Sequence, residues 1–204
     1  MQQDAWIFWT LLAFLCGSVP FSLLIGFWVL KVDVRSYGDG NPGAANVIRA
    51  GGWRVGIPAV LLDSFKGAAP VGSAYAVMGI QDWRIVPIAI APVAGHAFSP
   101  WLRFRGGKAI AVTFGVWTAL TLGEAPILLG IFLLLTHFTV AVDGWAVMLA
   151  MLGLLVWLLI SHHGSAFLGV WLGNVAILIF KHRHDLTQSP GVNPISLRLL
   201  RSRS

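Results

Sequence analysis

The chain has 204 residues, of which 57% are hydrophobic and 11% are charged, with ten tryptophans and a formal net charge of +6. Its mean hydropathy of +0.78 lies far above the values of ordinary soluble domains. The composition therefore excludes a typical soluble enzyme and indicates one integral membrane domain.

Seven apolar runs lie between polar interruptions, and a membrane-spanning helix needs about 20 mainly apolar residues. The runs are continuous rather than alternating, which excludes the strands of a membrane barrel. The first run follows Met1 to Asp4, which has no basic segment, so we expect it to stay as a spanning helix. We predict an all-α membrane protein, a bundle of about seven transmembrane helices in residues 1–181, followed by a basic tail in residues 182–204. The runs are residues 5–30, 55–79, 84–100, 109–122, 125–142, 145–160 and 165–180.

The positions of the cations predict the orientation, because Lys and Arg are retained on the cytoplasmic side. With the N-terminus outside and the C-terminus cytoplasmic, nearly all interhelical cations lie inside, whereas Arg84 lies outside and Lys66 lies within a run. We interpret the positive charge as topology and as attraction to an anionic inner leaflet, not as a nucleic-acid surface. The expected location is a bacterial inner membrane, crossed several times.

Residues 37–49, which read YGDGNPGAANVIR, form a polar stretch after the first apolar run. Glycine amides, asparagine side chains and a guanidinium at this spacing are typical of an anion-binding loop. A second polar loop, residues 103–108 (RFRGGK), leads directly into a short apolar run. A helix that starts after Lys108 would direct its N-terminal N–H groups at an anion. Together the loops predict a phosphate site at the cytoplasmic face.

Polar residues inside the apolar runs need partners, because ionisable groups are costly in hydrocarbon. Asp63 and Lys66 are three residues apart, which predicts an ion pair on one helical face. His96 lies just ahead of the basic loop, and a role in the site is as reasonable there as a core hydrogen bond. We interpret His137 as a helix-packing or boundary residue. Cys16 stands alone in the first run, so no metal site or disulfide is expected.

These motifs resemble the PlsY family of bacterial acyl-phosphate:glycerol-3-phosphate acyltransferases. Residues 38–47 (GDGNPGAANV) are similar to the first motif of that family. Residues 95–98 (GHAF) and 104–108 (FRGGK) are similar to its second, phosphate-binding motif, and His182 with Arg183 is similar to the start of its third. The resemblance extends over almost the whole chain and agrees with the predicted seven helices.

The resemblance implies acyl transfer from acyl phosphate to the 1-hydroxyl of glycerol 3-phosphate, which yields lysophosphatidic acid and phosphate for phospholipid biosynthesis. No cofactor is implied. The expected catalytic residues are Asp39, Lys108 and Arg49. The resemblance implies that Lys108 and Arg49 hold the phosphates, whereas Asp39 is a candidate base because of its own carboxylate. The expected substrate-binding residues are Gly38, Gly40, Asn41, Gly43, Asn46, His96, Gly106, Gly107, His182 and Asp185.

Four residues depart from the family pattern. Asp39 stands where the family usually has serine, Asp185 where it has asparagine, and Gln188 where arginine is common, while Asn193 lies near the place of a glutamate. An aspartate in a phosphate pocket is repelled unless it is protonated, paired or used as a base. One alternative is therefore a divergent paralogue that acylates another phosphorylated acceptor. Another is a non-catalytic transporter or lipid-binding protein that holds an anion at a broken helix.

Overall fold

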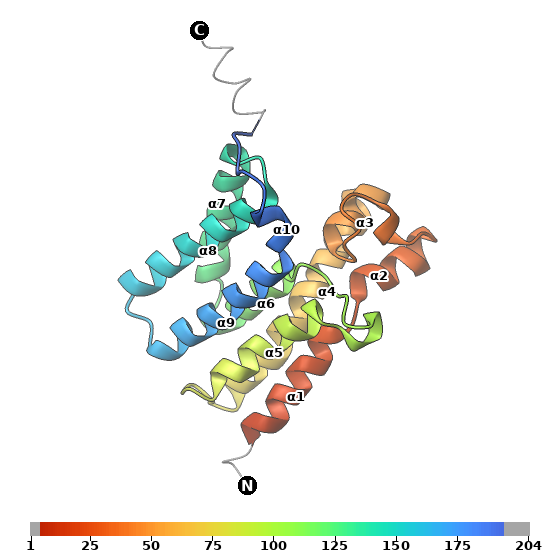
Figure 1. The fold of residues 1–204 in the computed structure, drawn as a ribbon. Coiled ribbons are helices and arrows are strands. Elements are labelled where there is room, and N and C mark those ends of the chain that lie inside the picture. The colour runs from red at the N-terminus through yellow and green to blue at the C-terminus, as the bar shows by residue number, and fades with distance from the viewer. Residues whose placement is uncertain (1–4, 194–204) are drawn as a thin grey trace.

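The computed structural model describes residues 5–193, and these residues form an all-helical bundle (Figure 1). The contribution of β-structure within this range is one isolated antiparallel bridge between Val140 and Val192. Each of the seven predicted apolar runs contains a helix. The α-helices are α1 (Ala5–Ser18), α2 (Phe21–Ile25), α3 (Ala44–Gly51), α4 (Trp53–Gly72), α5 (Ile85–Ala97), α6 (Ile110–Thr121), α7 (Glu124–Thr139), α8 (Asp143–Ile160), α9 (Ser165–Lys181) and α10 (Arg183–Leu186).

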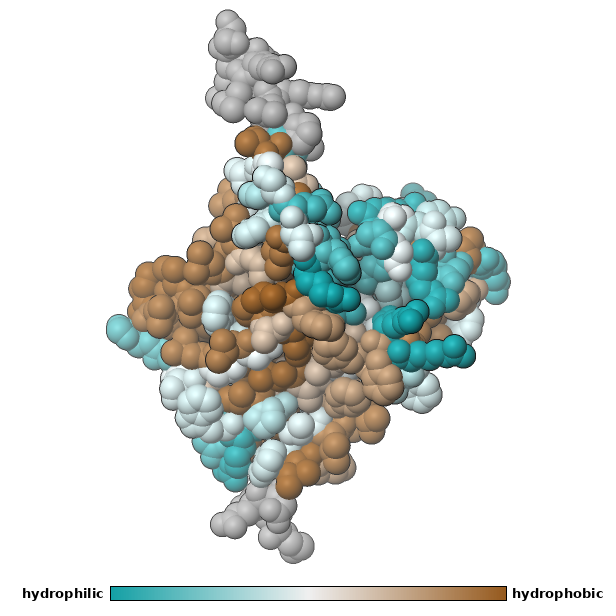
Figure 2. Space-filling model, in the orientation of Figure 1, coloured by the Kyte–Doolittle hydropathy of each residue, from teal (hydrophilic) through white to brown (hydrophobic). Residues whose placement is uncertain are grey.

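Within residues 5–193, three helical stretches are long and apolar enough to cross a membrane: Ala5–Leu30, Ile85–Leu102 and Asp143–Ile160. Three shorter apolar helices accompany them, namely Ile110–Thr121, Glu124–Thr139 and Ser165–Lys181. Many large apolar side chains on the outer faces are exposed, as expected for a surface that contacts lipid rather than water. Figure 2 shows this apolar surface in brown, with hydrophilic surface gathered at the end that carries α3 and α10.

α1 and α5 pack closely because each presents a glycine to the backbone of the other. A Cβ atom on Gly17 of α1 would lie 2.3 Å from the carbonyl oxygen of Pro92 on α5, and one on Gly95 of α5 would lie 2.3 Å from that of Phe14. Glycine lets the two backbones approach this closely, which is a common way of associating helices in membranes. α1 and α5 accordingly lie side by side (Figure 1).

The first helical stretch is interrupted at Val19 and Pro20, because proline has no N–H group and disfavours a helical residue before it. Polar side chains satisfy the carbonyls at this break. The Lys66 ammonium donates to the Val19 carbonyl at 2.7 Å, and the Ser99 hydroxyl donates to that of Ser18 at 2.6 Å. Unsatisfied backbone groups are costly inside a membrane, so these contacts fix the turn from α1 into α2.

The predicted polar stretch at residues 37–49 is a loop over its first half and a helix over its second, since α3 begins at Ala44. The description of the entire stretch as a loop was therefore wrong. Gly43 is the extended residue that precedes α3. The helix forms because Ala44, Ala45, Val47 and Ile48 favour or tolerate helical backbone once the Gly–Asn–Pro–Gly turn has ended.

α6 lies between α4 and α7 and packs against both of them. It begins at Ile110, directly after Ala109. The φ of 64° at Ala109 reverses the chain from residues 103–108, the glycine loop, into the helix. The expectation of a short helix immediately after Lys108 is confirmed. A buried polar link holds α6 to α9: Trp117 Nε1 donates to Asn174 Oδ1 at 3.2 Å, and Asn174 Nδ2 donates to Thr113 Oγ1 at 3.0 Å.

The beginning of the predicted tail packs on the bundle. α10 contacts α8 and α9, so residues 183–186 are part of the folded domain. Residues 194–204, to which we assign the end of the basic tail, lie outside the described residues.

Candidate active site

Asn46 organises the first motif from its buried position on α3. Its Nδ2 donates to the Asn41 carbonyl at 2.8 Å and to Asp39 Oδ1 at 3.2 Å. Its Oδ1 accepts a hydrogen bond of 2.6 Å from Arg49 Nη1. A Cβ on Gly38 would lie 2.5 Å from both the Arg49 and the Asn46 side chains, and Gly38 also has a positive φ of 55°. Glycine is therefore required at position 38 for the loop to close over α3.

The second motif is a tight loop held by the ends of two helices, α5 and α9. The Gly107 N–H donates to the His96 carbonyl at 3.1 Å, which ties the loop to the end of α5. The Lys181 ammonium, at the end of α9, donates to the Gly106 carbonyl at 2.7 Å and to that of Ala97 at 3.1 Å. Because these contacts fix the loop from both sides, the position of Lys108 is set by the backbone.

Lys108 joins the first motif to α10. Its ammonium lies 2.9 Å from Asp39 Oδ2 and 3.0 Å from Asp185 Oδ2. Arg49 Nη1 lies 4.0 Å from Asp39 Oδ1, whereas Arg35 pairs with Asp33 instead. Arg49, and not Arg35, is therefore the arginine beside Asp39.

The contacts shift the pKa values of both partners. Partial burial alone would raise the pKa of Asp39, but hydrogen bonds from Lys108, the Asn41 N–H and Asn46 together hold this pKa below its ordinary value. Partial burial alone would lower the pKa of Lys108, but Asp39 and Asp185 raise it above its ordinary value. At neutral pH the site thus holds an ionised aspartate against a charged lysine.

His182 and Asp185 are placed by α8. A Cβ on Gly144 would lie 2.5 Å from Asp185 Cβ and 3.3 Å from His182 Cβ, so the missing side chain of Gly144 makes room for both. His182 is 1% exposed, and its Nδ1 lies 2.9 Å from the Leu178 carbonyl oxygen. A carbonyl accepts hydrogen bonds only, so Nδ1 carries the proton of a neutral ring. No hydrogen-bond partner of Nε2 is found among the described residues.

These polar groups border a cavity of about 630 Å³. Its polar wall includes Asp39, Asn41, Arg49, Lys108 and His182. The remaining wall is mainly apolar and comes from α4, α6, α7 and α8, where it includes Trp53, Val60, Ile110, Phe114, Leu133, Leu134 and Val147. One cavity thus offers a charged end and a long apolar surface.

A buried ion pair lies behind the polar wall. Lys66 Nζ is 2.7 Å from Asp63 Oδ1, and both side chains are almost fully buried, which confirms the predicted pair. The Ser22 hydroxyl donates to Asp63, and His96 Nδ1 lies 3.9 Å from the same carboxylate. Asp63 and His96 both reach the cavity wall.

The structure brings most of the predicted site residues to this cavity. The lining includes Asp39, Asn41, Gly43, Arg49, His96, Lys108 and His182, and Asp185 joins them through Lys108. Asn46 and Gly38 shape the first loop, and Gly106 and Gly107 shape the second. Gly40, with a φ of 73°, turns the chain between Asp39 and Asn41.

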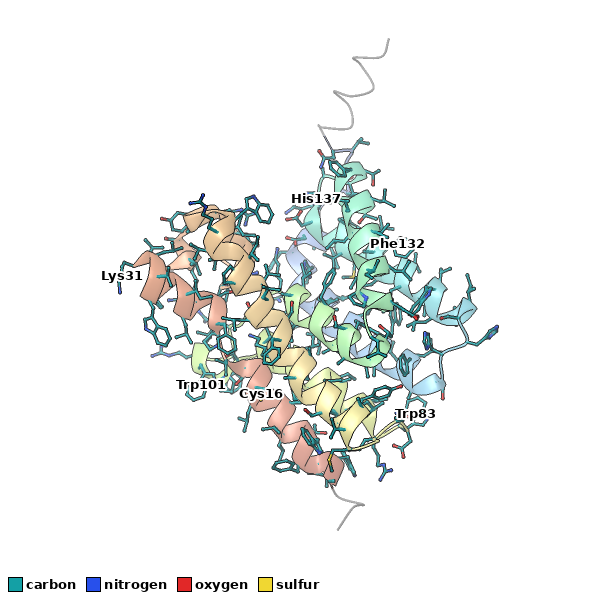
Figure 3. All side chains as sticks on the ribbon, turned by 180° about the vertical axis from the view of Figure 1, so that it is seen from behind. Cys16, Lys31, Trp83, Trp101, Phe132 and His137 are labelled. Atoms are coloured by element: carbon teal, nitrogen blue, oxygen red, sulfur yellow. The ribbon has the colours of Figure 1, made fainter. Side chains whose placement is uncertain are left out.

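Four residues near the site were not singled out from the sequence for a role in it: Lys181, Gly144, Asp143 and His137. The interpretation of His137 as a helix-packing or boundary residue did not foresee that it lines the cavity, where its Nδ1 lies 3.4 Å from Asp143 Oδ1. Figure 3 shows His137 near the end of α7, at the same end of the molecule as Lys31 and opposite Trp83. A cation next to the third motif was the available signal for Lys181. Nothing in the local sequence marks Gly144.

Comparison with known proteins identifies the family. The family model described as glycerol-3-phosphate acyltransferase matches residues 7–189. The chain belongs to this family. This confirms the resemblance to PlsY noted from the motifs.

Individual relatives agree with the family. Glycerol-3-phosphate acyltransferase 1 of Thermotoga maritima is 38% identical over 189 residues, which cover 85% of this chain and 92% of that protein. A Thermus thermophilus glycerol-3-phosphate acyltransferase is 44% identical over 131 residues, or 62% of this chain and 65% of that protein. The crystal structure of PlsY, an integral membrane glycerol 3-phosphate acyltransferase, in its glycerol 3-phosphate form has a TM-score of 0.81. It shares 27% identity, and the match covers 98% of this chain and 94% of PlsY.

Proposed function

We propose that this protein transfers an acyl group from acyl phosphate to the 1-hydroxyl of glycerol 3-phosphate. The products are lysophosphatidic acid and inorganic phosphate. The observation that carries the proposal is the meeting of Arg49, Lys108 and Asp39 at the polar end of a cavity whose remaining wall is mainly apolar. Phosphate groups fit the cations, and the acyl chain fits the apolar wall. The solved PlsY structures in glycerol 3-phosphate and lysophosphatidic acid forms support this assignment.

The proposed reaction is a direct displacement at the acyl carbonyl carbon. The acceptor hydroxyl oxygen forms the new ester bond, and the bond from the carbonyl carbon to the phosphate oxygen breaks. Asp39, ionised and facing the cavity, takes the hydroxyl proton and passes it to the departing phosphate. Lys108 and Arg49 stabilise the negative charge that develops on the carbonyl oxygen and on the phosphate. Asn41 and Asn46 hold the loop that orients the acceptor.

The cations that flank the first and second motifs support a cytoplasmic site in a multi-pass inner-membrane protein with its N-terminus outside. Exposed Lys31, Arg35, Arg103 and Arg105 lie near these loops. A negatively charged inner leaflet would attract this surface. The polar substrate would then enter from the cytoplasm, whereas the acyl chain would enter from the membrane.

The test is an assay of the purified protein with palmitoyl phosphate and labelled glycerol 3-phosphate. We expect lysophosphatidic acid and inorganic phosphate in equal amounts, with no product when palmitoyl-CoA replaces the acyl phosphate. Glycerol, and phosphorylated polyols other than glycerol 3-phosphate, serve as competing acceptors. Faster acylation of another phosphorylated polyol would show a divergent acceptor. If no acyl group is transferred to any acceptor, the proposal is contradicted and a non-catalytic lipid-binding or transport role is favoured.

A further inference from the structure

The two carboxylates on Lys108 are held differently. Asp39 accepts hydrogen bonds from the Asn41 N–H at 3.2 Å and from Asn46 Nδ2 at 3.2 Å, in addition to its contact with Lys108. Within residues 5–193, the Asp185 carboxylate accepts one side-chain hydrogen bond, which comes from Lys108. Asp185 is therefore the partner that an incoming anion displaces or joins more readily.

Among the described residues, the two cations that line the cavity, Arg49 and Lys108, both lie close to carboxylates. Lys108 contacts Asp39 and Asp185, and Arg49 lies 4.0 Å from Asp39. Two cations therefore face two carboxylates, and this part of the site is close to neutral. A fully ionised phosphate monoester would add two negative charges next to both carboxylates, which opposes its binding.

His182 provides an independent indication of what the site needs. Its side chain is 1% exposed, it lines the cavity, and its Nε2 has no hydrogen-bond partner among the described residues. In the neutral ring Nε2 is an acceptor, because Nδ1 donates to the Leu178 carbonyl. A buried acceptor without a partner calls for a donor on the ligand. A hydroxyl group of glycerol 3-phosphate supplies such a donor in either ionisation state of the phosphate, and a protonated phosphate would supply one as well.

We propose that the acceptor binds as a phosphate monoanion, with one proton shared between a phosphate oxygen and the Asp185 carboxylate. This inference rests on the proposed function and adds the ionisation state of its substrate. The shared proton turns the contact between two anions into a hydrogen bond and leaves Lys108 paired with the phosphate. Because glycerol 3-phosphate is mostly dianionic at neutral pH, binding takes up a proton from solution.

Other titratable groups lie around Asp185 and must be separated from it. Lys108 and Asp39 approach from the two loops. α8 contributes Asp143 beside Gly144, and the end of α9 with α10 contributes Lys181, His182, Arg183 and His184. His182 is the main alternative site for the proton, because a histidine that becomes protonated when an anion binds would also take up a proton from solution.

The test is titration calorimetry of the full-length protein with glycerol 3-phosphate, without acyl phosphate, in buffers of different ionisation enthalpy. At pH 7.5 we expect an uptake of about one proton per ligand, because the second pKa of a phosphate monoester is about 6. For the same reason the Kd should rise about tenfold between pH 7 and pH 8. Asp185→Asn should bind with almost no proton uptake, since its amide can donate directly to the dianion. Asp143→Asn is the matched control, because it removes a cavity-lining carboxylate that does not contact Lys108, and it should retain the uptake.

Proton uptake that persists in Asp185→Asn would overturn the inference. Loss of that uptake in His182→Gln would then assign the proton to the histidine. Binding and turnover of glycerol 3-phosphate without proton uptake in the parent would overturn this inference but leave the proposed function intact. If the parent neither binds nor turns over glycerol 3-phosphate, this inference and the proposed function are both contradicted. If folded Asp39→Asn binds glycerol 3-phosphate with the same proton uptake as the parent, the proton is assigned to Asp185 rather than to Asp39.

Discussion

The ammonium of Lys181 donates a hydrogen bond of 2.7 Å to the carbonyl of Gly106, so the end of α9 supports the glycine loop that carries Lys108. We predict that Lys181→Met raises the KM for glycerol 3-phosphate about tenfold or more, with a smaller effect on kcat, because the loop loses a donor that fixes its position. Steady-state kinetics test this. Lys181→Arg should recover part of the loss, and an unchanged KM in Lys181→Met would contradict the positioning role.

Lys108→Ala should lower acyl transfer by about 10² to 10³-fold, as expected when one preorganised anion-stabilising group is removed. Lys31→Ala is the matched control, because it removes an exposed cation outside the cavity lining, and it should retain activity. Arg49→Lys should also be impaired, because lysine cannot reproduce the planar contacts of a guanidinium. Near-normal turnover by a folded Lys108→Ala variant would exclude Lys108 from the mechanism.

Asp39→Asn should lower kcat strongly while glycerol 3-phosphate binds as well or better, because the variant loses the base and one negative charge. The pKa of Asp39 is held below its ordinary value of 3.8. A carboxylate is a base only above its pKa, so the activity that depends on Asp39 is present at neutral pH and is lost as the pH falls through this lowered pKa. Rate profiles of the parent and Asp39→Asn provide the check. The same acidic limb in both proteins would rule out Asp39 as the base.

Asp63→Ala should destabilise the protein by about 3–5 kcal/mol, because Lys66 would remain charged, buried and without its carboxylate partner. Thermal unfolding in detergent micelles measures the loss. The double variant Asp63→Leu with Lys66→Met removes both charges and should be more stable than Asp63→Ala. If Asp63→Ala unfolds like the parent, the buried pair does not stabilise the fold.

Accessibility labelling of single cysteines, in a Cys16→Ser background, tests the orientation. The loop before α3, the glycine loop and α10 should react only from the cytoplasm, whereas Asp82→Cys should react only from outside. Gly106 has no room for a side chain, so Arg105→Cys reports on its loop. Ser36→Cys and His184→Cys report on the other two segments. Labelling of Ser36→Cys and Arg105→Cys from opposite sides would contradict a shared site.

The sequence alone determined the helical membrane class, the Asp63 and Lys66 pair, and the two polar segments of the site. Each of these depends on local properties: the length of an apolar run, helical periodicity, or a short motif. The length of the loop before α3 was missed, because whether a Gly–Asn–Pro–Gly turn leads into a helix depends on Asn46 reaching back to Asn41 and Asp39.

Tertiary structure decided which charged groups meet. Asp185 is separated from Lys108 by 77 positions in the chain, and its place depends on Gly144 leaving room on α8. The role of Lys181 and the place of His137 on the cavity wall likewise depend on how α9 and α7 pack against their neighbours. A sequence pattern shows which residues share a helix face, but the distance between faces of different helices follows from packing alone. For this reason the motifs indicated a phosphate site, and only the fold showed that two carboxylates share its lysine.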